Sequence, residues 1–195
     1  MSGTPQGGPT PRRRLRNIPE IRSFFRTNET PVFFVGPTGF NLLGLDRWMR
    51  NFSYVAYYDS FDGAHPRVFS PTDKPYVEFT SAEEINNYLL RHDEVQRFIA
   101  RKGGTPKVAM VFFDEETEQI CDELGYELIL PPHRLRQHLD SKITTTKLGT
   151  EAGAPSVPNV LGSAGNYPEL VDLATRHGLG TDLVVQLPYG DSGKT

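Results

Sequence analysis

The chain ends on residue types that bind phosphate: Gly190, Asp191, Ser192, Gly193, Lys194 and Thr195. Glycines let successive backbone N–H groups converge on phosphate oxygens, a lysine adds a positive charge, and a serine or threonine adds a hydroxyl. A Walker A P-loop requires a glycine, four further residues and then Gly-Lys-Ser/Thr. Here Pro188 occupies that first position, and Gly190 lies only three residues before Gly193. The spacing disfavours a P-loop, although a P-loop NTPase or kinase stays open as an alternative function.

The elements before this loop are typical of the start of a second domain. Four of them are expected: a helix over 142–152 that opens at Ser141-Lys142 and is capped by Gly153, an extended segment over 154–158, a second helix over 168–177 and a strand over 183–187. A natural domain seldom ends on a strand that has no sheet neighbour, so we expect the sequence to be truncated.

Strands alternate with helices earlier in the chain. Strands are predicted over 32–35, 54–58, 76–79, 108–113 and 127–130, and helices over 41–50, 81–102, 114–124 and 133–140. This alternation implies a mostly parallel sheet that is covered on both faces. The sequence therefore predicts an Arg/Pro/Gly-rich flexible tail and lead-in over 1–30, an α/β domain over 31–140 and a second domain over 141–195.

Taken in order, these segments resemble the start of the ATP-grasp fold of biotin carboxylases and their relatives. The resemblance rests on Ser141-Lys142 opening a helix, the turn at 152–155, Val157-Pro158, the second helix, and Leu183-Val184-Val185 before the glycine loop. It implies a Rossmann-like pre-ATP-grasp domain with a mostly parallel sheet, followed by the beginning of an ATP-grasp α+β subdomain. In that family one lysine at the start of the first helix binds ATP. A second, on the strand before the loop, binds its phosphates.

Lys142 matches the first of these lysines, but the position of the second holds Gln186. Glutamine can donate a hydrogen bond and brings no charge. Lys194 is the nearest replacement for the missing charge. The resemblance thus predicts a nucleotide site made of Lys142, Gln186, Gly190, Ser192, Gly193, Lys194 and Thr195. The missing lysine favours a divergent ligase over a true carboxylase.

The resemblance also implies a reaction. An ATP-grasp ligase transfers the γ-phosphoryl group of ATP to a carboxylate, and an amine or another nucleophile attacks the resulting acylphosphate. In biotin carboxylation the carboxylate is bicarbonate. The family's Mg²⁺ ligands, adenine pocket and catalytic arginine lie beyond Thr195, so this fragment alone is expected to be inactive. The expected partners are ATP and a small carboxylate; a homodimer stays open, as does a non-catalytic α/β binding module.

Composition limits the classes of partner and cellular compartment that fit this chain. The net charge of −3 and pI near 6.0 give no global reason to expect nucleic acid or an anionic membrane as a partner. Cys121 is the only cysteine, so an intrachain disulfide framework is excluded, which fits a reducing cytosol. No apolar run approaches the roughly 18 residues of a membrane span, and no signal peptide is recognisable. We expect a cytoplasmic protein.

Other polar residues have ordinary structural explanations. The cluster Arg12-Arg13-Arg14 is typical of a solvated basic tail. Gly36, Gly39 and Asp59 resemble a dinucleotide fingerprint only weakly, because the G-x-G-x-x-G spacing is absent, and a structural turn is favoured. The acids at 114–116 open a helix, where the macrodipole favours negative charge. Cys121 is predicted to be apolar filler, and the sequence predicts no metal ligand set.

Overall fold

The computed structural model describes residues 14–39, 44–74, 76, 78–180 and 182–190. The chain divides into two compact units, residues 1–130 and residues 131–195. Within the described residues, every helix is too short or too polar to cross a bilayer.

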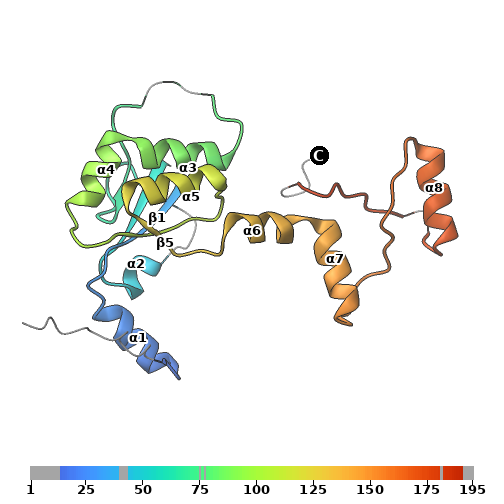
Figure 1. Cartoon of the computed structure of the whole chain (residues 1–195), viewed down its shortest axis with the longest axis horizontal. Coiled ribbons are helices and arrows are strands. Elements are labelled where there is room, and N and C mark those ends of the chain that lie inside the picture. Colours follow the sequence, from blue (N-terminus) through green and yellow to red (C-terminus); the bar gives the residue numbers. More distant parts are fainter. Residues whose placement is uncertain (1–13, 40–43, 75, 77, 181, 191–195) are drawn as a thin grey trace, which may run out of the picture. The chain divides into compact units, whose positions relative to one another are not determined.

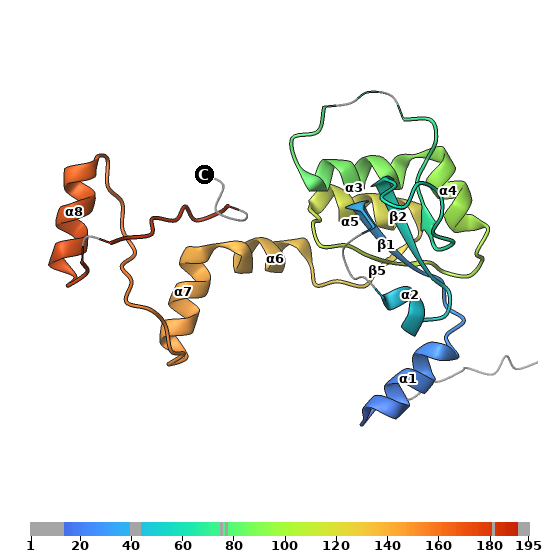
Figure 2. The same cartoon turned by 180° about the vertical axis from the view of Figure 1, so that it is seen from behind.

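A parallel five-stranded sheet forms the centre of the first unit (Figure 1, Figure 2). Its strands are β1 (Val32–Thr38), β2 (Phe52–Tyr58), β3 (Val68–Phe69), β4 (Lys107–Ala109) and β5 (Glu127–Leu128). They lie in the order β3-β2-β1-β4-β5, and every adjacent pair is parallel. The chain moves outward from β1 to β3 and then crosses back to β4, as in Rossmann-like sheets. The predicted α/β class with a parallel sheet is confirmed.

Both faces of the sheet are covered. The helices of this unit are α1 (Ile18–Arg26), α2 (Leu45–Trp48), α3 (Ala82–Arg91), α4 (Asp93–Ala100) and α5 (Glu115–Leu124). Phe33 and Val35 belong to the main core, which also contains buried residues of α3, α4 and α5. Val32 and Phe34 point to the opposite face, since side chains alternate along a strand, and pack near Leu45 of α2. Burial on both sides explains the continuously apolar sequence of β1.

The single helix expected over 81–102 is wrong, because the chain forms two helices that separate at His92. His92 has extended backbone, with φ −75° and ψ 126°, and ends α3. Its Nδ1 accepts a hydrogen bond from the Glu94 backbone N–H at 3.1 Å and so caps α4. Buried apolar residues such as Leu89 and Val95 occur on both sides of the break, so the hydrophobic pattern does not reveal it.

The strand expected over 76–79 is also wrong. The described residues there, Tyr76, Glu78 and Phe79, belong to no strand, and Tyr76 is 96% exposed. The short β3 pairs with β2 instead. Of the helix expected over 41–50, residues 44–50 are described and contain only α2, while 41–43 lie outside the described residues. α1 lies in the segment 1–30, for which no element was predicted.

The second unit contains the helices that the sequence predicted: α6 (His133–Asp140), α7 (Lys142–Glu151) and α8 (Tyr167–Arg176). α6 and α7 contact each other. Gly153 follows α7 with φ +69°, a conformation that favours glycine and ends the helix as predicted.

The strand expected over 183–187 is wrong. These residues belong to no strand, and Val184 is 87% exposed. A strand needs the backbone of a neighbour to satisfy its N–H and C=O groups. Among the described residues of this unit, no other segment forms a strand that could pair with it.

Candidate functional site

The candidate site is built on the first turn of α7, where Ser141 is the N-cap. The Ser141 side chain is buried, and its hydroxyl accepts a hydrogen bond from the Thr144 backbone N–H at 3.4 Å. Its carbonyl oxygen accepts bonds from the Thr145 backbone N–H at 2.9 Å and from the Thr145 hydroxyl at 3.2 Å. A serine cap satisfies one N–H of the first turn and leaves others available for further acceptors. The cap therefore fixes Lys142 at the first position of the helix.

Lys142 holds the segment before the glycine loop with both its main chain and its side chain. Its backbone N–H donates to the Pro188 carbonyl oxygen at 2.8 Å. Its ammonium donates to the Gly190 carbonyl oxygen, also at 2.8 Å. The structure thus brings Lys142 together with Gly190, although 48 residues separate them in the sequence. An ammonium has three donors, and the bond to Gly190 uses one of them.

Of the other residues of the predicted nucleotide site, the structure describes only Gln186. Gln186 is exposed on the extended segment that precedes the loop, and in the described part of the chain it makes no hydrogen bond to Lys142. Ser192, Gly193, Lys194 and Thr195 lie outside the described residues, so their predicted roles stay predictions. Of the seven predicted positions, the structure joins Lys142 and Gly190.

The electrostatics of this site suit an anion. The backbone N–H groups at a helix N-terminus carry partial positive charge, and the ammonium of Lys142 adds a full charge beside them. Among the described residues, no group of three or more His, Cys, Asp or Glu side chains could hold a metal ion, so the predicted Mg²⁺ site stays a prediction. The arrangement therefore offers positive charge to an anion.

Parallel α/β sheets commonly bind ligands at their carboxyl edge, where the strand order reverses, here between β1 and β4. Gly36 lies within β1, and Gly39 follows directly after its last residue, Thr38. A Cβ on Gly39 would lie 3.2 Å from Cε2 of Phe61, so this glycine permits close packing. Both carboxylate oxygens of Asp59 accept backbone N–H bonds, from Phe61 at 2.9 Å and Gly63 at 2.7 Å. Gly39 thus allows Phe61 to pack against the end of β1, and Asp59 orders the turn that follows β2.

A polar cluster between α3 and α5 was not predicted. Asn87 donates to an oxygen of Asp114 at 3.1 Å, and the Thr117 hydroxyl donates to the Asn87 amide oxygen at 2.6 Å. The neighbouring Asn86 donates to the Phe112 carbonyl oxygen at 2.7 Å. The available signal was two adjacent asparagines at helix positions where the apolar spacing predicts burial. The cluster ties α3 to the start of α5.

The same cluster sets the ionisation of Asp114. Partial burial alone would raise the pKa of its carboxyl group, but hydrogen bonds outweigh burial and lower the pKa. The donors are the Thr117 backbone N–H and the Asn87 amide, while the Thr117 hydroxyl, 2.9 Å from the same carboxylate oxygen, shares its single proton between Asp114 and Asn87. Asp114 accepts the bond from the Thr117 N–H at 2.9 Å and so caps α5. Its ionised form is part of the structure of the first unit.

Comparison with known proteins adds no assignment. No family model, no curated protein and no solved structure matches this chain. Its function is therefore inferred from the residues themselves, chiefly from Lys142 and the segment that it binds.

Proposed function

We propose that this chain is the N-terminal part of an ATP-dependent ligase of the ATP-grasp type, in which Lys142 binds the phosphates of ATP. The proposal is supported above all by the double attachment of Lys142 to Pro188 and Gly190. This is the pair of segments that the resemblance requires to meet around the triphosphate. In this proposal residues 31–140 are the pre-ATP-grasp domain, and residues 141–195, with α7 and α8, begin the ATP-grasp subdomain.

Lys142 would act by position and charge. Its bond to Gly190 holds the ammonium beside the first residue of the glycine-rich sequence, and its remaining donors are proposed to reach phosphate oxygens. A carboxylate oxygen of the substrate attacks the γ-phosphorus, ADP leaves, and an acylphosphate forms. An amine then attacks the acyl carbon and phosphate leaves. Neutralising the phosphate charges and fixing their position provide most of the catalysis in such transfers.

The uncharged Gln186 narrows the proposal to a divergent member of this class. A glutamine amide can donate to a phosphate oxygen, but such a bond lacks the ionic contribution of a lysine. We propose that Lys194 supplies the second charge. Mg²⁺ would be held by carboxylates that the resemblance places after Thr195, and it would neutralise the β- and γ-phosphates. ATP and a small carboxylate are the proposed substrates.

Replacing Lys142 by alanine in the full-length protein tests the assignment. The variant loses one charge-assisted hydrogen bond to phosphate, so the Kd for ATP should rise by roughly tenfold or more. Isothermal titration calorimetry with ATP measures this change. Lys147 is the matched control, because it is an exposed lysine of the same helix.

Lys147→Ala should leave the Kd within about twofold of the original value, since loss of a solvated charge changes binding little. An unchanged Kd in Lys142→Ala would remove the basis of the proposed site. Equal weakening by both variants would show a general charge effect in place of a specific contact.

A further inference from the structure

Positive charge is concentrated at the start of the chain. The first 50 residues contain eight arginines, no lysine and three carboxylates, a formal charge of +5 in a chain whose total is −3. Three of these arginines, Arg22, Arg26 and Arg47, belong to the helices α1 and α2. The first unit therefore carries an ordered basic region that the overall net charge conceals.

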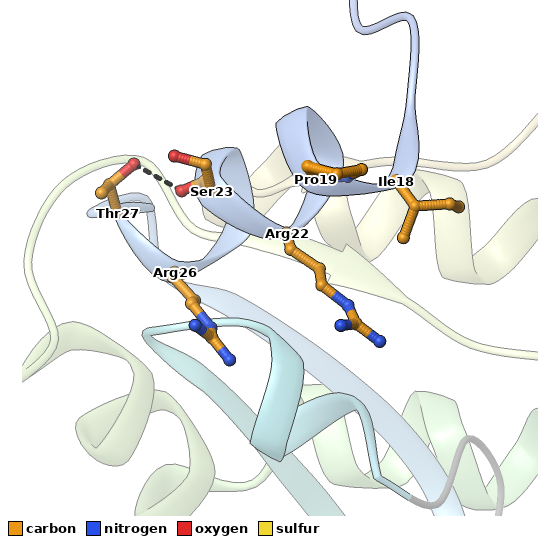
Figure 3. Close-up of a pocket in the computed structure, with 6 residues that line it drawn as sticks. All are labelled: Ile18, Pro19, Arg22, Ser23, Arg26 and Thr27. Atoms are coloured by element: carbon orange, nitrogen blue, oxygen red, sulfur yellow. Dashed lines mark hydrogen bonds between the residues drawn. The ribbon is translucent and has the colours of Figure 1, made fainter.

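The three arginines meet in one cleft. Arg22 and Arg26 are one turn apart on α1 and extend side by side (Figure 3). With Arg47 and Trp48 of α2 they line a cleft of about 190 Å³. The Arg22 guanidinium lies 4.6 Å from the centroid of the Trp48 ring, a cation–π geometry that fixes this arginine over the indole. A small cleft is thus lined by three arginines and one tryptophan.

Hydrogen bonds hold the two helices in this arrangement. The Arg50 backbone N–H donates to the Phe25 carbonyl oxygen at 3.0 Å. The Asn28 side-chain amide donates to the Arg50 carbonyl oxygen at 3.0 Å, and that of Asn51 donates to the Glu29 carbonyl oxygen at 2.9 Å. The end of α1 is therefore tied to the residues that follow α2. Such preorganisation lowers the entropic cost of binding a ligand.

The charge of the cleft is not neutralised within the described part of the chain. No ion pair there joins a carboxylate to Arg22, Arg26 or Arg47. The carboxylate beside Arg47 in the sequence, Asp46, lies 3.5 Å from His65 instead. Three like charges around one cleft repel each other, and an anion that contacts all three relieves that repulsion.

We propose that this arginine cleft binds a small, multiply charged phosphate such as a di- or triphosphate, at a site distinct from Lys142. Guanidinium groups match phosphate because their planar, forked donors form two parallel hydrogen bonds. The size of the cleft fits a compact ligand, and its lining residues are solvent-accessible side chains of two helices. A nucleic acid is instead bound through a series of phosphates along its length.

Fluorescence provides a local measurement, because Trp48 is the only tryptophan of the chain. Inorganic tripolyphosphate should change the Trp48 emission in a saturable way when it engages the Arg22 that covers the ring. The double variant Arg26→Gln/Arg47→Gln retains Arg22 on Trp48 and removes two charges. Its Kd for tripolyphosphate should rise roughly tenfold or more. Circular dichroism checks that both proteins have the same fold.

Two controls separate the cleft from general charge and from the proposed ATP site. Arg101→Gln removes an exposed arginine at the end of α4, and Lys142→Ala alters the second unit. Both should leave the Kd for tripolyphosphate within about twofold of the original value. An unchanged Kd in the double variant, or a response that disappears in Lys142→Ala, would overturn the proposal.

Vesicles test the membrane alternative. Phosphatidylcholine vesicles that contain phosphatidylinositol 4,5-bisphosphate should compete no better than free tripolyphosphate at equal phosphate concentration. Binding to these vesicles without any fluorescence response to free tripolyphosphate would contradict a small-phosphate site. Absence of a saturable response to either probe would do the same.

Discussion

The two compact units of the molecule bury their side chains to very different extents. Every described hydrophobic residue of the buried core except Ala174 lies in the first unit, on the sheet and the helices that cover it. In the second unit large apolar side chains such as Val157, Val184 and Leu187 are more than half exposed. The first unit therefore has a buried core on both faces of its sheet, and the described second unit has none of comparable size.

This difference places most of the stability in the first unit, whereas the proposed ATP contact lies in the second. Burial of apolar surface is the dominant favourable contribution to folding, so most of the free energy of unfolding should reside in the first unit. The second unit is joined locally by helix caps and by bonds such as those of Lys142 to Pro188 and Gly190. Ligand-binding segments are often drawn from the less stable parts of a protein, which agrees with an ATP contact at Lys142.

Replacing a leucine in each unit should give the largest difference in the free energy of unfolding. Leu89 in α3 is fully buried, whereas Leu187 in the second unit is 52% exposed. Leu89→Ala should lower the free energy of unfolding of the first unit by about 2–5 kcal/mol, because it leaves a cavity in the core. Leu187→Ala should change it by less than about 0.5 kcal/mol. Urea denaturation, followed by circular dichroism and thiol labelling, measures both values.

Thiol labelling reports on the first unit because Cys121 of α5 is the only cysteine and is buried. Burial, with smaller contributions from Asp122 and Glu118, raises the pKa of its thiol to about 11. Labelling at neutral pH therefore requires the unit to open. Leu89→Ala should accelerate labelling and Leu187→Ala should not. Equal acceleration by both would mean that the two units unfold as one cooperative body.

The sequence predicted helix ends well where capping residues occur at those ends. Asp114 and Gly125 mark the two ends of α5, and Ser141 and Gly153 flank α7. These residues act through the backbone of their own helix, so local sequence is sufficient. Strands were predicted less well, since a strand also depends on a partner. The apolar segment 183–187 has strand composition and no paired neighbour.

The candidate sites, like the strands, depend on contacts between segments that are distant in the sequence. The meeting of Lys142 with Gly190 was suggested by the order of segments in a family resemblance, and neither residue alone indicates it. The arginine cleft was not predicted, because it depends on the packing of α1 against α2. Arg22 and Arg47 are far apart in the sequence, and periodicity carries no information on such a contact.

Removing one matched helix cap in each unit should give an intermediate difference in stability. Asp114 caps α5 in the first unit, and Asn166 caps α8 in the second, each by accepting a backbone N–H at the third helical position. Asp114→Ala should lower the stability of the first unit by about 1–2 kcal/mol, because it removes the cap and a partner of Asn87. Asn166→Ala should fray α8 and leave Cys121 labelling unchanged. A comparable loss in both variants would contradict the assignment of stability to the first unit.

The smallest expected effect is a pH dependence confined to the first unit. Hydrogen bonds from Thr117 and Asn87 outweigh burial and lower the pKa of Asp114 below the value of about 3.9 that an unfolded chain has. The stabilisation by ionised Asp114 is therefore complete above that value and is lost as the pH falls through the folded pKa. Asp114→Asn retains a capping side chain but cannot titrate. Between roughly pH 5 and pH 2.5, the original protein should lose more stability than Asp114→Asn, by less than about 1 kcal/mol because Asp114 is partly exposed. Urea midpoints over this range measure the difference. The contributions of the other carboxylates to the pH dependence cancel, because both proteins contain them. Identical pH profiles would show that the buried cluster does not depend on the charge of Asp114.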